Sequence, residues 1–342
     1  MKKYKLYRLL FLLYLISVSL TGCDFVHEFP DDNPVDPSLI DVSLTLSIDM
    51  HFESDTIFQT YATMLEGDYD VRYIVDIYEV NPNSTTYDVK NRIQRIVKTE
   101  NNIVTNGIYD FKDTLKLPAK KYELIGWIDF VEKGTNTDKY YNTADLQQVS
   151  IILQNGQYEG YNTTKDAFTA QTEVDLTPYR KQRYVHYTTT MDMIRPFAVY
   201  RIITTDMEEY KTYHQSSYAS VQPAWTKVLY NLYFPMGYNA FICSPENFLS
   251  GINYQFDVTD VVPGKEAIVA SDYVFVGNDV FYQVNFEILG SDDNHINTVN
   301  NLRIDLKRNH VTVIRGQFLT KDLSNGGIGI NDQFTDEIII QI

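Results

Sequence analysis

Cysteine, basic residues and long apolar runs are all scarce in this sequence. The chain of 342 residues contains 2 cysteines, so a scaffold built on several disulfides is excluded. Lys and Arg number 29 against 45 Asp and Glu, which gives a formal net charge of −16 at pH 7. A chain this acidic repels phosphate backbones, and we therefore expect no nucleic-acid partner. The longest uncharged apolar run, Leu9 to Leu20, is shorter than the roughly 20 residues that a membrane-spanning helix needs.

The N-terminus instead matches an export signal followed by a lipid-attachment site. A positive start precedes the apolar run and is formed by Lys2, Lys3, Lys5 and Arg8. The run ends in Leu20-Thr21-Gly22-Cys23, the pattern of a bacterial lipobox. At such a site the thiol is diacylated, the peptide bond before it is cut and the new amine is acylated. We predict that residues 1–22 are a lipoprotein signal peptide and that Cys23 carries the lipid. The alternative is a signal peptide without lipid, followed by a chance cysteine.

A lipid on Cys23 would anchor the exported chain to a membrane without spanning it. Each acyl chain contributes about 0.8 kcal/mol per buried methylene, and two or more chains hold a folded domain stably. Residues 23–40 are rich in Asp and Pro and show little periodicity, so we predict a flexible leash. With Cys23 acylated, Cys243 has no intramolecular disulfide partner. Its apolar neighbours indicate a buried small hydrophobe rather than a reactive thiol.

Beyond the leash, the sequence is patterned for β-strands. The first clear signal is 42–50, where apolar residues alternate with polar ones at a period of two. The chain also contains 27 Tyr and 18 Phe, and aromatic residues favour strands over helices. Further strands are predicted at 71–80, 114–117, 122–130, 149–153 and 167–174.

A second set of strand signals follows a polar and basic stretch at 175–183, where we predict a domain boundary. Its strands are predicted at 184–193, 197–205, 227–234, 254–258, 267–276, 280–289, 302–306, 311–319 and 338–342. Only 206–213 is compatible with a short helix. Many short strands separated by turns are typical of β-sandwiches. We predict an all-β chain with one β-sandwich over 41–180 and a second over 181–342.

Several short segments resemble the fimbrillin family, the lipoprotein-derived major and minor fimbrial subunits and Mfa-like adhesion proteins of certain anaerobic Gram-negative bacteria. The segments are Leu117 to Tyr122 continuing into Gly126 to Phe130, Asp166 to Thr169, Arg195 to Ala198, and Lys307 to Gly316. They span both predicted domains, and each is a strand-and-turn signature rather than a catalytic one. The resemblance implies two tandem transthyretin-like β-sandwiches, an N-terminal lipid signal and assembly by strand exchange.

The resemblance also implies a mode of assembly. In polymerising members, a protease specific for Arg or Lys removes the N-terminal segment together with the first strand. A neighbour's terminal strand then fills the groove, pairing with the exposed sheet edges while alternate side chains enter core pockets. By this resemblance, the assembly residues belong to the first strand and to the C-terminal strand, and each of these could equally be an ordinary sandwich strand. They are Val42, Leu44, Leu46, Ile48, Ile338, Ile340 and Ile342.

The chain departs from the polymerising pattern in one respect. No Lys or Arg lies between Arg8 and Arg72. A protease of that specificity therefore has no site on the leash or just after the first strand, and Arg72 lies inside a predicted strand, where cleavage is hindered. We expect the lipid and the first strand to be retained. Retention favours an anchor, terminating or accessory subunit over a stalk subunit.

The sequence contains no recognisable catalytic or metal-binding pattern. Its six histidines never fall at the spacing of metal ligands on a helix. No Gly-x-Ser-x-Gly motif is present, and the glycines of 326–329 lack the Lys-Ser/Thr of a phosphate loop. The run 291–294 offers oxygen ligands but lacks the spacing of a calcium loop, so a solvated loop is favoured. We assign no catalytic residue, no metal site and no cofactor.

The aromatic residues leave one alternative open. Trp127 and Trp225, with the many tyrosines, could form a platform on which sugars stack, although a core position is favoured for Trp127. Our interpretation is a non-enzymatic, lipid-anchored outer-membrane protein, exposed on the surface or on fimbriae. It would act as a fimbrial or cell-adhesion subunit with other fimbrial subunits as partners. The alternative is a surface glycan-binding lipoprotein whose ligand is a glycan or a host-surface molecule.

Overall fold

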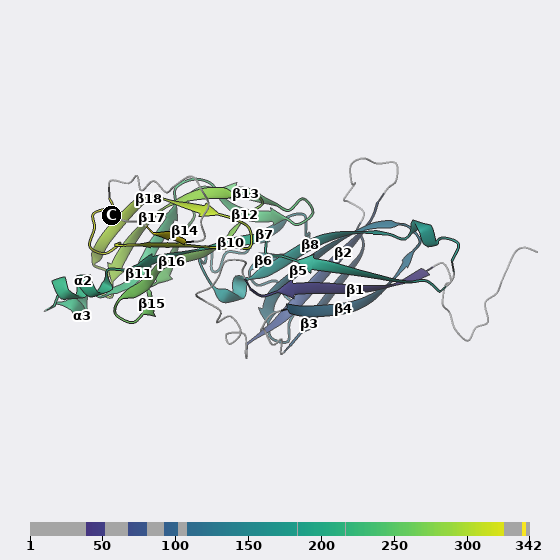
Figure 1. The fold of residues 1–342 in the computed structure, drawn as a ribbon, viewed down its shortest axis with the longest axis horizontal. Coiled ribbons are helices and arrows are strands. Elements are labelled where there is room, and N and C mark those ends of the chain that lie inside the picture. The colour runs from purple at the N-terminus through teal and green to yellow at the C-terminus, as the bar shows by residue number, and fades with distance from the viewer. Residues whose placement is uncertain are drawn as a thin grey trace, which may run out of the picture. The chain divides into compact units, whose positions relative to one another are not determined.

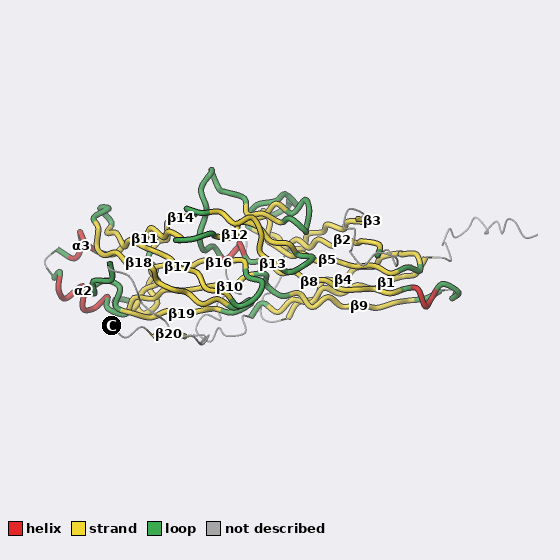
Figure 2. The backbone as a smooth tube through the Cα atoms, turned by 90° about the horizontal axis from the view of Figure 1, so that it is seen from above, coloured by secondary structure: helices red, strands yellow, loops and turns green. Residues whose placement is uncertain are grey.

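The computed structural model describes residues 39–51, 68–80, 92–101, 108–182, 184–215, 217–324 and 337–339. These residues form an all-β structure, as predicted, in which strands dominate and helices are short (Figures 1 and 2). The helical elements are α2 (Met207–Tyr213), α3 (Tyr218–Val221) and the 3-10 helices η2 (Thr163–Lys165) and η3 (Thr177–Tyr179). The short helix predicted at 206–213 is confirmed by α2. In the described ranges, no helix has the length and apolar character needed to cross a bilayer. The predicted signal peptide, Cys23 and most of the leash lie outside these ranges.

Two sheets enclose the first core. One has the strand order β4-β1-β9 and the other the order β3-β2-β5-β8. Alternate side chains of β1, β2, β4, β5 and β8 meet between the sheets, as the period-two pattern requires. The strands are β1 (Leu39–Asp49), β2 (Tyr69–Glu79), β3 (Arg92–Glu100), β4 (Ile108–Pro118), β5 (Lys121–Glu132), β8 (Ala167–Asp175) and β9 (His186–Met193).

Two further sheets enclose the second core. Their strand orders are β15-β16-β10-β19-β20 and β14-β11-β17-β18. The core between them is rich in tyrosine and contains Tyr158, Tyr200, Tyr230 and Tyr254. The strands are β10 (Phe197–Thr204), β11 (Pro223–Tyr230), β14 (Asn253–Asp257), β15 (Thr259–Val262), β16 (Glu266–Phe275), β17 (Val280–Gly290), β18 (His295–Leu306), β19 (Val311–Gly316) and β20 (Glu337–Ile339).

A third core joins the two sandwiches. A small sheet with the order β13-β12-β7-β6 packs against the outward faces of strands from both. Because of this packing, β2 and β10 are buried on both faces, so their buried residues are consecutive rather than alternating. The small sheet is formed by β6 (Tyr141–Asn142), β7 (Val149–Ile151), β12 (Phe234–Asn239) and β13 (Ser244–Leu249).

The strand β9 belongs to the first sandwich, although its sequence follows the predicted boundary. It pairs in parallel with β1 over eight positions, from Asp41 opposite His186 to Ile48 opposite Met193. The next residue, Ile194, exchanges backbone hydrogen bonds with Thr169 of β8. Division into domains at 180 and 181 stays a prediction. From the strand pairing we propose that the boundary lies after Ile194 instead.

Glu123 offers a test, by pH, of the stability of the first sandwich. It lies on β5 directly opposite Glu173 of β8 and is 7 % exposed. Burial raises the pKa of Glu123 above its ordinary value of 4.5, and Glu173 adds to this while Lys121 opposes it. The folded state therefore holds the proton more tightly than the unfolded chain, so the group stabilises the fold below pH 4.5 and this contribution is lost as the pH rises through the raised value.

Glu123→Gln, which imitates the protonated side chain, is expected to be more stable than the natural chain at pH 7. Below pH 4.5 the two chains should unfold at the same temperature, because the natural carboxyl is then protonated in both states. Thermal unfolding followed by circular dichroism at both pH values measures this. An equal difference in melting temperature at the two pH values would show that the effect is not one of charge.

Candidate functional site

The first strand lies in the middle of its sheet. β1 pairs on one side with β4 and on the other with β9, so both of its backbone edges are occupied (Figure 2). The two neighbours are far from β1 in sequence, and the pairing with β9 is parallel. Two parallel neighbouring strands need a long connection between them. Here the chain between β1 and β9 contains most of the other strands of the first sandwich. Without β1, a groove with two unpaired strand edges would therefore separate β4 from β9.

Alternate side chains of β1 fill the first core. Val42, Leu44, Leu46 and Ile48 are each exposed by 1 % or less, and Met50 just beyond the strand is also buried. The intervening residues are half-buried or exposed, so the alternation predicted from the sequence is present along the whole strand. Burial of one such side chain stabilises a fold by about 1.5–3 kcal/mol. The strand therefore contributes on the order of 10 kcal/mol at most, because the unfolded chain is itself partly compact.

A buried arginine holds the end of β1. The guanidinium of Arg195 donates to the main-chain oxygens of Met50 (2.8 Å) and His51 (3.1 Å), directly after the strand. It also forms a paired contact with Asp166, with Nε 2.8 Å from Oδ1 and Nη2 2.8 Å from Oδ2. A further bond runs from Nη1 to Oδ1 of Asn309 at 3.3 Å. The backbone at the exit of β1 is thus tied to residues of three distant segments.

The Arg195 cluster, meaning Arg195 with Asp166, Phe168, Arg308 and Asn309, unites three of the segments that carry the fimbrillin resemblance. The guanidinium carbon lies 4.5 Å from the centre of the Phe168 ring, and Nε of Arg308 donates to the oxygen of Arg195 at 2.9 Å. From the sequence, these segments are strand-and-turn signatures, and their strand patterns do not predict that they meet in the fold. One sequence feature points to this meeting: Asp166 and Arg195 are opposite charges in segments that show no strand alternation of their own.

The ion pair between Arg195 and Asp166 in the Arg195 cluster is fully buried. Arg195 is 0 % and Asp166 is 1 % exposed. Burial raises the pKa of Asp166, and the facing guanidinium acts against this by stabilising the carboxylate. Removing one partner of such a pair leaves an uncompensated buried charge, which costs about 3–5 kcal/mol. The exit of β1 is therefore fixed by an interaction that is expensive to break.

Arg72 is the first basic residue after Arg8, and it is also buried. It lies on β2, is 2 % exposed and forms a two-point ion pair with Asp129, at 2.8 and 2.6 Å. Its Nη1 contacts Oδ1 of Asp138 at 2.8 Å. A protease that recognises arginine needs the side chain in its own specificity pocket. In the folded chain, Arg72 is held inside the sheet instead.

A described protein family matches residues 36–342, and its description is a family of unknown function, DUF6562. The match covers both sandwiches and the whole of β1. The chain belongs to the DUF6562 family. No curated protein matches the chain.

This DUF6562 chain is similar to several solved structures. One is the fimbrial anchor protein Mfa2 from Porphyromonas gingivalis, at 9 % identity and a TM-score of 0.39, covering 76 % of this chain and 82 % of that one. Another is a candidate cell adhesion protein from Bacteroides eggerthii, at 12 % identity and a TM-score of 0.43, covering 90 % and 94 %. A third is a candidate polysaccharide-binding protein from Bacteroides thetaiotaomicron, at 10 % identity and a TM-score of 0.42, covering 76 % and 80 %. Fimbrial and adhesion structures are thus among the similar ones, as the sequence resemblance predicted. At these TM-scores the similarity carries no argument about function.

The C-terminal strand of the DUF6562 chain lies at the edge of a sheet. β20 pairs in parallel with β19 through three positions, among them Ile314 opposite Ile338. Of the three C-terminal residues predicted for assembly, Ile338 lies in this pairing, whereas Ile340 and Ile342 lie outside the described residues. Among the strands that the structure describes, β20 has one partner and β1 has two.

The two tryptophans do not form a common platform. Trp127 is fully buried in the third core, with its ring edge-on to Tyr141. Trp225 is half-buried and donates from Nε1 to Oδ1 of Asp293 at 2.9 Å. Asp293 lies in the turn between β17 and β18, which is the run considered for calcium. Across the described ranges, no group of three or more His, Cys, Asp or Glu side chains is placed to hold a metal ion. Cys243 is free and half-buried, so it is less enclosed than the sequence indicated.

Proposed function

We propose that the mature chain is a non-enzymatic, lipid-anchored outer-membrane subunit of a fimbrial or adhesive assembly, and that it retains β1. The observation that carries the proposal is the position of β1, which is paired on both edges and inserts alternate apolar side chains into the core. A groove with this geometry accepts an extended strand by pairing with its backbone and by enclosing alternate side chains. In this chain its own first strand already occupies the groove.

Retention of β1 assigns the chain to one end of an assembly rather than to its repeating part. A subunit whose groove is filled in cis cannot accept a strand from a neighbour at that site. The lack of Lys and Arg between Arg8 and Arg72, together with the burial of Arg72, supports retention. With Cys23 acylated, such a chain would act as an anchor, terminating or accessory subunit.

The C-terminal strand is the segment that we propose is donated to a partner subunit. β20 pairs with β19 through three residues and has one neighbouring strand in the sheet. An edge strand pairs on one side only, so within the described residues β20 is held in cis by fewer strand contacts than a central strand such as β1. Ile338, Ile340 and Ile342 alternate along this segment, and alternate side chains are what a receiving groove encloses.

Association with partner subunits tests this proposal. The native chain, extracted from membranes and purified, should bring other fimbrial subunits with it. A chain truncated after residue 336 should fold normally and lose them, because it lacks the donated strand. A matched variant with Ile338 and Ile340 replaced by Val should retain them. Recovery of the natural chain as an acylated monomer without partners would count against an assembly role.

Limited proteolysis is expected to leave β1 attached. Trypsin acting on the folded chain should cut in exposed turns, such as those after Lys133 and Lys265, because these turns expose their basic side chains. No cut should occur before residue 73, because Arg72 is buried and no earlier basic residue follows the signal. Mass spectrometry of the fragments measures this. A fragment that begins at Tyr73 while the rest of the fold persists would contradict the protection of Arg72.

A further inference from the structure

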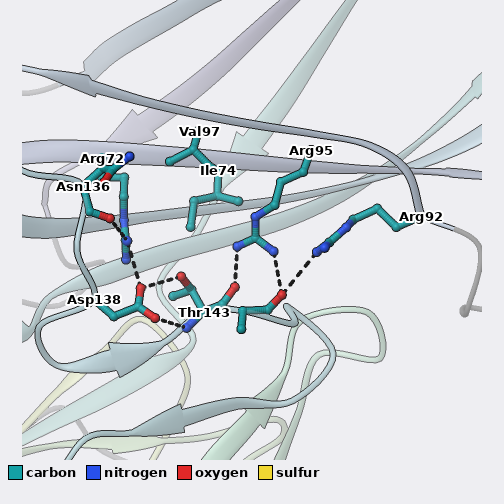
Figure 3. Close-up of a pocket in the computed structure, with 9 residues that line it drawn as sticks. Arg72, Ile74, Arg92, Arg95, Val97, Asn136, Asp138 and Thr143 are labelled. Carbon is teal, nitrogen blue, oxygen red and sulfur yellow. Dashed lines mark hydrogen bonds and ion pairs between the residues drawn. The ribbon is translucent and has the colours of Figure 1, made fainter.

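An arginine-lined recess opens on the outward face of β2 and β3. It has a volume of about 330 Å³, which lies within the roughly 300–1,000 Å³ usual for small-ligand sites. Figure 3 shows the side chains of β2 and β3 directed toward the segment 136–144, which forms the opposite wall. The polar side chains that line it are Arg72, Arg92, Arg95, Asn136, Asp138 and Thr143.

Two arginines meet at one end of the recess. Arg92 and Arg95 both contact a single carboxylate oxygen, Oδ2 of the buried Asp76, at 3.1 and 3.3 Å. Both also donate to the oxygen of Ala144, at 3.2 and 2.8 Å (Figure 3). Two guanidinium groups thus face one carboxylate. Asp138 and Asp145 also act on these groups, so an anion at this end would be held by charge-assisted hydrogen bonds to free arginine donors rather than by a net positive charge.

Arg92 is the member of this pair with unused donors, because Arg95 donates from Nη1 to Asp76 and Ala144 and from Nη2 to the main-chain oxygen of Thr143. Arg92 donates from Nη1 alone, so its Nε and Nη2 have no partner within the described part of the chain. Its side chain is 36 % exposed, whereas that of Asp76 is 0 % exposed. Burial lowers the pKa of Arg95, and the nearby Arg92 adds to this against the attraction of Asp76. A bound anion would relieve the repulsion between the two cations.

The other end of the recess is suited to hydroxyl groups. There Arg72 is already matched by Asp129 and Asp138. Asp138 accepts from Arg72 and from the hydroxyl and amide of Thr143, which leaves room for one more donor on a carboxylate that accepts about four bonds. Asn136 is exposed and presents an amide at the same wall. A ligand that fits must therefore carry a negative group at one end and hydroxyl groups at the other.

We propose that this recess binds an acidic monosaccharide unit of a glycan, a uronic or sialic acid. Its carboxylate would lie on Arg92 and Arg95, and its hydroxyl groups on Asp138 and Asn136. The net charge of −16 disfavours densely charged polyanions and acidic peptides more than a ligand with one charge per ring. The proposal is independent of strand retention, because the recess does not include β1.

Calorimetric titration of the full lipidated chain tests the proposal. The chain is kept in a detergent without a sugar headgroup and titrated with glucuronic acid, N-acetylneuraminic acid and glucose. Saturable binding of at least one acidic sugar is expected, with glucose about tenfold or more weaker because it lacks the charged group. Equal binding of glucose, or no binding of either acidic sugar, would overturn the proposal. Stronger binding of a glutamate-rich peptide would overturn it in favour of a protein ligand.

Two substitutions on the same strand locate the site. Arg92→Gln should weaken acidic-sugar binding about tenfold or more, since it removes a charge-assisted fork. Lys98→Gln removes the same charge from β3 at a residue whose amine pairs with Asp113 outside the recess, and it should leave binding unchanged. Melting temperatures establish that both variants fold. If Arg92→Gln does not fold, Asn136→Ala in the exposed wall replaces it, with a severalfold loss expected. Unchanged binding in a folded recess variant would overturn the proposal.

Discussion

Arg195→Met is expected to lower the free energy of unfolding by about 3–5 kcal/mol, because the substitution leaves Asp166 buried without its cation. The loss should be accompanied by release of the end of β1, since the main-chain oxygens of Met50 and His51 lose their donor. Urea unfolding measures the first effect. Hydrogen exchange measures the second, with faster exchange expected in β1 than in β2 or β5.

An arginine in a less buried ion pair provides the control. Arg303 contacts Asp305 at 2.8 Å, and its side chain is 31 % exposed. Arg303→Met should cost about 1 kcal/mol or less, because exposed pairs contribute little. Equal losses for the two variants would show that burial of the Arg195 cluster is not what gives it its effect. If Arg195→Met greatly lowers the free energy of unfolding but leaves hydrogen exchange in β1 unchanged, the Arg195 cluster stabilises the fold without holding β1.

Removal of β1 is expected to have the largest effect of any change to the chain. A chain that begins after His51 loses the apolar side chains of the strand and leaves the edges of β4 and β9 unpaired. Unpaired edges beside an open core recruit other strands, so the truncated chain should aggregate or form linear oligomers. A synthetic peptide of residues 39–51, added during refolding, should restore a monomer. Size-exclusion chromatography with the peptide labelled measures the rescue.

The rescue must depend on the side chains that enter the core. A peptide in which Leu44 and Leu46 are both replaced by Asp keeps the backbone donors and acceptors but cannot enter the apolar groove. It should fail to restore the monomer. A second control replaces the half-buried Ser43 and Ser47 by Thr, and this peptide should rescue normally. Rescue by the aspartate peptide would mean that backbone pairing alone holds β1.

The strand pattern of the first sandwich was predictable where one face is buried and the other is not. β1 has a polar residue after each apolar one, and its alternation in the structure is the alternation of the sequence. The edge strand β3 was not predicted, because it is exposed on most of both faces and so lacks a period of two. β12 and β13 were also missed. Both contain proline, and β12 contains glycine, a composition that indicates turns.

The pairing of strands far apart in the chain could not be predicted from the local sequence. The place of β9 beside β1 depends on contacts between residues more than a hundred positions apart, and the polar stretch before β9 gave a local reason to separate them. The Arg195 cluster likewise depends on contacts between residues that are far apart in the sequence. Arg195 precedes a proline and Asp166 follows a 3-10 helix, so neither belongs to a strand pattern. Arg195 and Asp166 are brought together by the fold alone, whereas the lack of Lys and Arg between Arg8 and Arg72 is visible in the sequence itself.

The N-terminus of the native protein is the most direct test of the account. The chain should be extracted from the cells that make it and analysed by intact mass spectrometry and N-terminal peptide mapping. We predict a mature chain that begins at an acylated Cys23 and still contains residues 39–51. A mature form without lipid that begins near residue 50 would contradict it, because β1 would then have been removed and its groove opened to another strand.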